Sequence, residues 1–270
     1  MPVVPNYGKP LPQSEGPKLH PFHDCKSAIK FVRLLSDVES KGHAHVFEIS
    51  IGSKAYALKM FKFYDDDEDR IGLIRGDNDL VPISLLHAHM DPFFNECRAY
   101  GRLIERGQNG KIAARCYGYT AISAEREEAL YRKYGVEHWG RPVGDRQPIR
   151  AIVKELIEDD SPLTHKVAKK ILKDLRKMHK MGIYPMDVRA RNYKAGLLVD
   201  MSIAMTTPHF LFKIRSRWQI EMLQGQDLAM FDSMIGDEEV IPSVRALPNE
   251  EYCTKLRSQK KKDELAEKRL

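Results

Sequence analysis

The sequence contains no apolar run near the ~18–20 residues that a membrane-spanning helix needs. Its first residues also lack a basic segment followed by an apolar one, so no secretory signal is expected. Cysteine is scarce, and Cys25, Cys97, Cys116 and Cys253 form no C-x-x-C pair. Neither a disulfide framework nor a zinc site is therefore expected. These absences predict an intracellular protein, cytoplasmic or nuclear, with reduced thiols and no membrane contact.

The net positive charge is small, and most of it lies at the C-terminal end. The formal net charge is +6, and +4 of it lies in residues 255–270. The remainder is close to neutral, which argues against a dedicated nucleic-acid binder. The basic tail, residues 251–270, could be a nuclear import signal or an arm that contacts phosphates. It could equally be a solvated helical end rich in Lys and Glu.

The composition is that of a soluble globular protein, with 42% apolar and 30% charged residues over 270 positions. Five prolines in residues 1–20 predict a flexible leader that does not pack. Residues 21–157 read as a sheet-rich part with loop insertions, and residues 158–250 as a smaller helical part. The expected fold class is therefore α+β.

Alternating apolar and polar residues on both sides of Gly52-Ser53 predict a hairpin of strands 45–51 and 54–63. Residues 24–35 suggest a short helix or a helix leading into a strand, and residues 123–147 are polar and irregular enough to be a loop. The remaining patterns predict strands at 113–122, 150–157 and 197–199, and helices at 93–106, 163–181 and 217–235.

Five polar side chains occur on these elements in an order that suggests a phosphate site. Lys59 lies on the second hairpin strand, where an ammonium group is a fixed charge, and Glu96 lies near the start of the following helix. Asp187 and Asn192 are five residues apart in the loop after the 163–181 helix, and Asp200 follows a short apolar strand. Taken alone, each has an ordinary explanation, such as a solvated lysine, a glutamate at a helix start or an aspartate in a turn.

This order resembles that of the protein kinases, and residues 36–235 look like a kinase-like bilobal fold, with a small sheet-rich N-lobe and a reduced helical C-lobe. The runs 96–100, 187–193 and 197–200 are especially similar to a fungal kinase-like group whose members are often labelled inner-kinetochore subunits.

The resemblance implies ATP and Mg²⁺ as cofactors. Lys59 and Glu96 would then hold the phosphates, and Asp187 would orient an acceptor hydroxyl. Arg189 would neutralise the γ-phosphate, and Asn192 and Asp200 would hold the metal.

Three further positions belong to the same resemblance. Glu155 and Ile157 lie where the backbone of the kinase hinge binds adenine. Asp227 resembles the buried aspartate that braces the catalytic loop, although an ordinary residue near a helix start is an equal explanation.

The sequence departs from kinases at several points. Only Gly42 remains of the glycine-rich phosphate loop, Pro185-Met186 replaces His-Arg, and Met201-Ser202 replaces Phe-Gly.

Because of these departures, two functions stay open. One is an ATP- and Mg²⁺-dependent phosphotransferase acting on an unknown hydroxyl or protein acceptor. The other is a weak or inactive pseudokinase that serves as a scaffold in a nuclear or kinetochore assembly. A third hypothesis, nucleic-acid binding, would depend on the basic tail alone.

Overall fold

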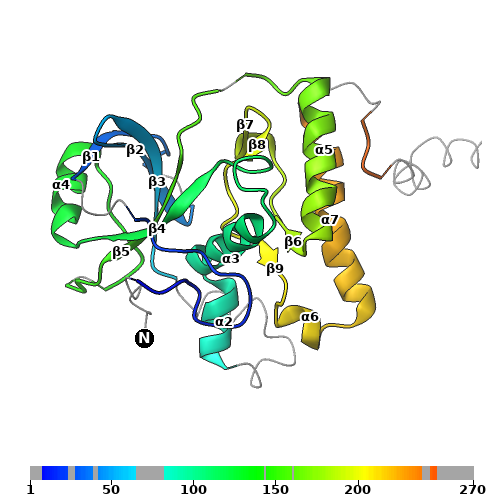
Figure 1. The fold of residues 1–270 in the computed structure, drawn as a ribbon, viewed down its shortest axis with the longest axis horizontal. Helices are drawn as coiled ribbons and strands as arrows, with labels where there is room; N and C mark the ends of the chain where they lie inside the picture. Colours follow the sequence, from blue (N-terminus) through cyan, green and yellow to red (C-terminus); the bar gives the residue numbers. More distant parts are fainter. Residues whose placement is uncertain are drawn as a thin grey trace, which may run out of the picture.

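The computed structural model describes residues 8–23, 28–38, 42–64, 82–142, 144–159, 161–238 and 244–247. The basic tail that the sequence predicts at 251–270 lies outside these residues. The α+β class is confirmed: a five-stranded antiparallel sheet in the order β1-β2-β3-β5-β4 packs beside several helices (Figure 1). Within the described ranges, no helix is both long and apolar enough to cross a bilayer.

The predicted hairpin is confirmed as β2 (Ala44–Ile51) and β3 (Lys54–Phe61), with Gly52 in the turn at a φ of 59°. The sheet is completed by β1 (Ile29–Leu34), β4 (Cys116–Ile122) and β5 (Ile149–Glu155). Side chains alternate between the two faces of each strand. Leu58 and Met60 join one apolar cluster with β2, whereas Phe61 joins a second cluster with the helices.

The principal helices are α2 (Ile83–Met90), α3 (Pro92–Glu105), α4 (Glu125–Tyr134), α5 (His165–Lys180), α6 (Leu211–Ile214) and α7 (Arg217–Asp237). Short pieces connect α5 to α6: β6 (Ile183–Tyr184), the 3₁₀ turn η2 (Ala190–Asn192), β7 (Tyr193–Lys194), β8 (Leu197–Leu198) and β9 (Met205–Thr206). Thr164 caps α5 by accepting a hydrogen bond from the backbone N–H of Val167, and a capping box at Ser216 begins α7.

Three segments differ from the sequence expectation, and two of them lie in the sheet-rich part. Residues 29–34 form the edge strand β1, and the expected loop at 123–147 contains helix α4. Among the described residues of α4, Leu130 alone is buried. The helix therefore lacks the apolar stripe from which a helix is predicted. Its acidic first turn, basic last turn and left-handed Gly135 cap stabilise it instead.

The N-terminal segment also differs. The sequence predicts an unpacked leader, but residues 8–22, here called the arm, lie against α3 and β4. Leu11 and Leu19 are fully buried and exchange two backbone hydrogen bonds of 2.9 and 2.6 Å. A side chain at Gly101 of α3 would come within 2.7 Å of the Lys18 carbonyl carbon, so helix and arm are in direct contact. Two buried leucines and backbone pairing outweigh the proline content.

We expect Leu19→Ala to destabilise the protein by about 2–5 kcal/mol, because it opens a cavity in a fully buried site. Val38, whose side chain is 42% exposed, is the matched control, and Val38→Ala should cost less than about 1 kcal/mol. Chemical denaturation of both variants measures the difference. Equal losses would mean that the arm does not pack as described.

Three buried histidines predict acid sensitivity. Burial, with nearby cations, lowers the pKa of His45 and of His209 to about 4 and that of His89 to about 3. Since the unfolded groups bind protons below about pH 6.5 and the folded ones do not, stability is lost as pH falls from 6.5 towards 4. Between pH 7 and 5 we expect a loss of about 1–2 kcal/mol per histidine.

Denaturant titrations at both pH values test this expectation. His45→Gln should reduce the pH dependence, whereas His138→Gln should leave it unchanged, because the side chain of His138 is 84% exposed. A free energy of unfolding that is the same at pH 7 and 5 would contradict it.

Candidate functional site

The centre of the candidate site is a buried ion pair between β3 and α3. The Lys59 ammonium lies 2.8 Å from Glu96 Oε2, and the two side chains are 4% and 0% exposed. Lys59 faces α3 because it shares the strand face of Phe61, which packs against Phe93. Glu96 lies one turn into α3, whose start is fixed by Pro92 and by the Asp91 cap. The two residues that the sequence pairs are therefore in contact.

Asp200, from the segment after β8, completes this cluster. Its Oδ1 lies 2.7 Å from the Lys59 ammonium and accepts a 2.8 Å hydrogen bond from the Ser202 backbone. Burial alone would raise the pKa of Asp200, but Lys59 and Lys154 outweigh it and hold that pKa well below its ordinary value. Burial likewise lowers the pKa of Lys59, and the Asp200 and Glu96 carboxylates raise it above the ordinary value. Both groups are therefore charged at neutral pH.

Lys154 is a member of the cluster that sequence reasoning missed. From β5, its ammonium lies 2.7 Å from Glu96 Oε1 and donates a 2.6 Å hydrogen bond to the Val199 carbonyl. Glu96 thus binds one lysine with each oxygen. The alternation of side chains along β5 could have indicated it, because Arg150 and Lys154 lie on the same face of the strand. Arg150 is likewise buried, in an ion pair with Asp91.

Asp187 and Asn192 meet in the loop between α5 and β7. The Asn192 amide donates to the Asp187 carbonyl at 2.9 Å and to its Oδ2 at 3.0 Å. Arg189 Nε lies 2.7 Å from Oδ1, yet that buried oxygen receives no aligned hydrogen bond from the described residues. A buried acceptor without an aligned donor is unusual in a folded protein, and the Arg189 guanidinium compensates the charge of this oxygen. The Arg189 side chain itself is 56% exposed.

Asp227 holds this loop in place from α7. Its fully buried carboxylate accepts a 2.7 Å hydrogen bond from the Met186 backbone through Oδ1, and Oδ2 lies 2.9 Å from His179 Nε2. Met186 has a φ of 63°, a strained value for a side chain of this size. The carboxylate stabilises that conformation, as the bracing hypothesis for Asp227 expects.

A cleft of about 200 Å³ lies beside this cluster and is lined by four of the groups described above. Lys59, Lys154, Asn192 and Asp200 line it, together with the strand-end segment 155–157 that contains the predicted Glu155 and Ile157. The Glu155 N–H already donates to the Arg115 carbonyl at 2.8 Å. The described lining residues do not include four predicted positions: Gly42, Glu96, Asp187 and Arg189. The structure thus gathers most, though not all, of the predicted positions around one cavity.

The described residues contain no group of three or more His, Cys, Asp or Glu side chains that could hold a metal ion by themselves. Asp200 and Asn192 nevertheless offer oxygen atoms, the ligand type that Mg²⁺ prefers. Both contacts of Asp200 use Oδ1, which leaves Oδ2, and the side chain is 39% exposed. Two protein oxygens fit an ion whose other ligands come from phosphates and water.

Most of the chain matches the model of a known protein family. Residues 7–205 match the family model described as FTA2, kinetochore Sim4 complex subunit. The matched range includes the arm, the whole sheet and all of the cluster residues described above. No curated protein matches the chain.

Removing the central carboxylate should be costly. Glu96→Gln leaves two buried ammonium groups without their shared partner, so we expect a loss of about 3–5 kcal/mol in unfolding free energy. Glu128 pairs with Arg132 on the surface of α4, and Glu128→Gln should cost at most about 1 kcal/mol.

Lys154→Met tests whether Glu96 is shared between the two lysines. It keeps the Lys59–Glu96 pair, so it should destabilise less than Glu96→Gln in the same denaturant titration. An effect of Glu96→Gln no larger than that of Glu128→Gln would contradict the described cluster.

Proposed function

Because the chain belongs to the FTA2 family of kinetochore Sim4 complex subunits, we propose that it is a kinase-like, Mg·ATP-binding member of a nuclear protein complex. Its reaction is transfer of a phosphoryl group to a hydroxyl acceptor. The observation that carries the proposal is the position of the Lys59 ammonium, 2.8 Å from Glu96 and 2.7 Å from Asp200 at the cleft.

The order of elements supports a kinase-like bilobal arrangement. The five-stranded sheet and α3 form one part, and α5, α7 and the short strands form the other (Figure 1). The cleft lies where β3 and β5 face the segment from Asn192 to Asp200. Kinases place their nucleotide between two such parts, and that likeness concerns the fold alone.

In this proposal each part of the nucleotide is assigned to a region of the cleft. The Glu155 N–H is used within the sheet, so the base edge would bind the Glu155 carbonyl and the Ile157 backbone. The phosphates would take over part of the Lys59 charge from Asp200, while Glu96 keeps the ammonium in place. Asn192 and Asp200 would hold Mg²⁺ through their oxygens, and the ion supplies charge neutralisation of the phosphates when bound.

The transfer step needs a proton acceptor and positive charge. Asp187 Oδ1 would take the proton of the acceptor hydroxyl as its oxygen bonds to the terminal phosphorus, while the bond from that phosphorus to the leaving nucleoside diphosphate breaks. Arg189 lies over Oδ1 and is largely exposed, so it can turn from the carboxylate to the transferred phosphoryl group. Asn192 holds the other oxygen of Asp187 and fixes its direction.

A second candidate is a scaffold that uses the same residues only for stability. Two observations favour it: the cleft of about 200 Å³ is smaller than the ~300–1,000 Å³ of most ligand pockets, and Lys154 fills part of its inner wall. In this scheme the cluster of two lysines and two acids holds the two parts together, and the protein acts through its partners.

The deciding experiment measures Mg·ATP binding and turnover of purified protein. For the transferase we expect turnover to fall by about 10²–10⁴-fold in Asp187→Asn, which removes the proton acceptor. Asp174→Asn on α5 is the matched control and should retain turnover, because Asp174 pairs with Lys170 away from the cleft. Lys59→Ala should weaken nucleotide binding.

Other results separate the two candidates. Thermal stabilisation by Mg·ATP without turnover would support a nucleotide-binding scaffold. Absence of both binding and turnover in the wild-type protein would overturn the nucleotide proposal and leave the structural role of the cluster.

A further inference from the structure

Helix α5 carries a dense group of positive charges on its exposed side. Its buried stripe is apolar, as in any amphipathic helix. Its other positions hold seven basic residues against one acidic residue, Asp174: Lys166, Lys169, Lys170, Lys173, Arg176, Lys177 and Lys180. This helix therefore has a formal charge of +6, equal to that of the whole chain.

These charges are not arranged as on an ordinary solvated helix. Such helices place acids four residues before bases, which stabilises them, whereas like charges at that spacing destabilise. Here Lys169 and Lys173, Lys173 and Lys177, and Arg176 and Lys180 are like-charged pairs at that spacing. Within the described part of the chain, Lys169, Lys173 and Lys180 form no ion pair. The helix thus keeps an unfavourable arrangement that an anionic ligand would relieve.

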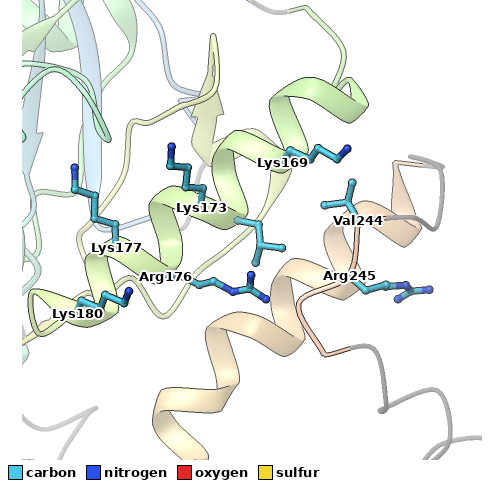
Figure 2. A pocket seen from close by; sticks show the side chains of 8 residues that line it. Lys169, Lys173, Arg176, Lys177, Lys180, Val244 and Arg245 are labelled. Carbon is cyan, nitrogen blue, oxygen red and sulfur yellow. The ribbon is translucent and has the colours of Figure 1, made fainter.

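The same side chains line a groove of about 580 Å³ between α5 and the segment 244–247. Figure 2 shows them along α5, with Val244 and Arg245 on the facing segment. That second wall is anchored: the backbone N–H groups of Ala246 and Leu247 donate to the Asp232 carboxylate at 2.7 and 2.9 Å. Leu172 and Val244 form the apolar part of the lining, and no acidic side chain is among the described lining residues.

We propose that this basic groove binds an acidic segment of a protein partner, with acidic residues at alternate positions around an apolar anchor. One helical turn separates successive basic residues by about 5.4 Å, and alternate residues of an extended strand are about 6.6 Å apart. The carboxylates would therefore meet successive cations while the anchor contacts Leu172 and Val244. A concave site with an apolar floor suits a peptide better than a duplex, and a subunit of a protein complex has protein partners.

The test uses fluorescence anisotropy with full-length protein. The probe is a labelled peptide of about twelve residues that alternates Glu and Ser around a central Leu. We expect Lys169→Glu/Lys173→Glu to weaken its binding at least about tenfold. Lys30→Glu/Lys54→Glu is the matched control, because it changes the net charge equally at exposed strand positions. It should alter binding by less than about twofold.

Thermal denaturation verifies that both double variants fold, and Lys169→Gln/Lys173→Gln provides a milder change with the same expected direction. A peptide with Gln in place of Glu should not bind. Absence of binding by the Glu peptide, or equal weakening by the two double variants, would overturn the proposal. So would tighter binding of a short DNA duplex that the α5 variant abolishes, since the groove would then be a nucleic-acid site.

Discussion

The fold around the cleft depends on one buried carboxylate that pairs with two ammonium groups. A charge removed from water is tolerated only when it is paired and hydrogen-bonded, and Glu96 meets that condition through Lys59 and Lys154 together. This arrangement joins β3, β5 and α3. Through the Val199 carbonyl and Asp200 it also reaches the segment after β8. Four elements thus take their relative positions from a few charged atoms, and the apolar clusters fill the space around them.

The sequence predicted the candidate site where function depends on order and spacing. Asp187 and Asn192 are close in sequence, so their contact follows from one loop, and Lys59 and Glu96 lie on elements with clear periodicity. Lys154 was missed because its partner is 58 residues away. Its burial depends on which face of β5 packs against α3, and local pattern does not determine that. The roles of these residues with ATP and Mg²⁺ remain predictions.

Outside the site, the sequence predicted the structure least well where local composition does not show how a segment packs. Prolines in the first twenty residues are typical of an unpacked chain, yet Leu11 and Leu19 are in the core. Helix α4 has too few buried residues for a periodic signal. The charge of α5 is hidden in the net charge, because acidic residues elsewhere balance it and the chain outside the tail is close to neutral.

The helix that carries Glu96 is enclosed on two sides, by the sheet and by the arm. Arg98 of the same helix extends the enclosure, since its guanidinium binds the Glu15 carbonyl at 2.7 Å and the carbonyls of Thr206 and Pro208. At Gly101 the helix and the Lys18 backbone touch with no room for a methyl group. Any larger residue at position 101 would push the arm away from α3. The sequences of the arm and of α3 therefore constrain each other.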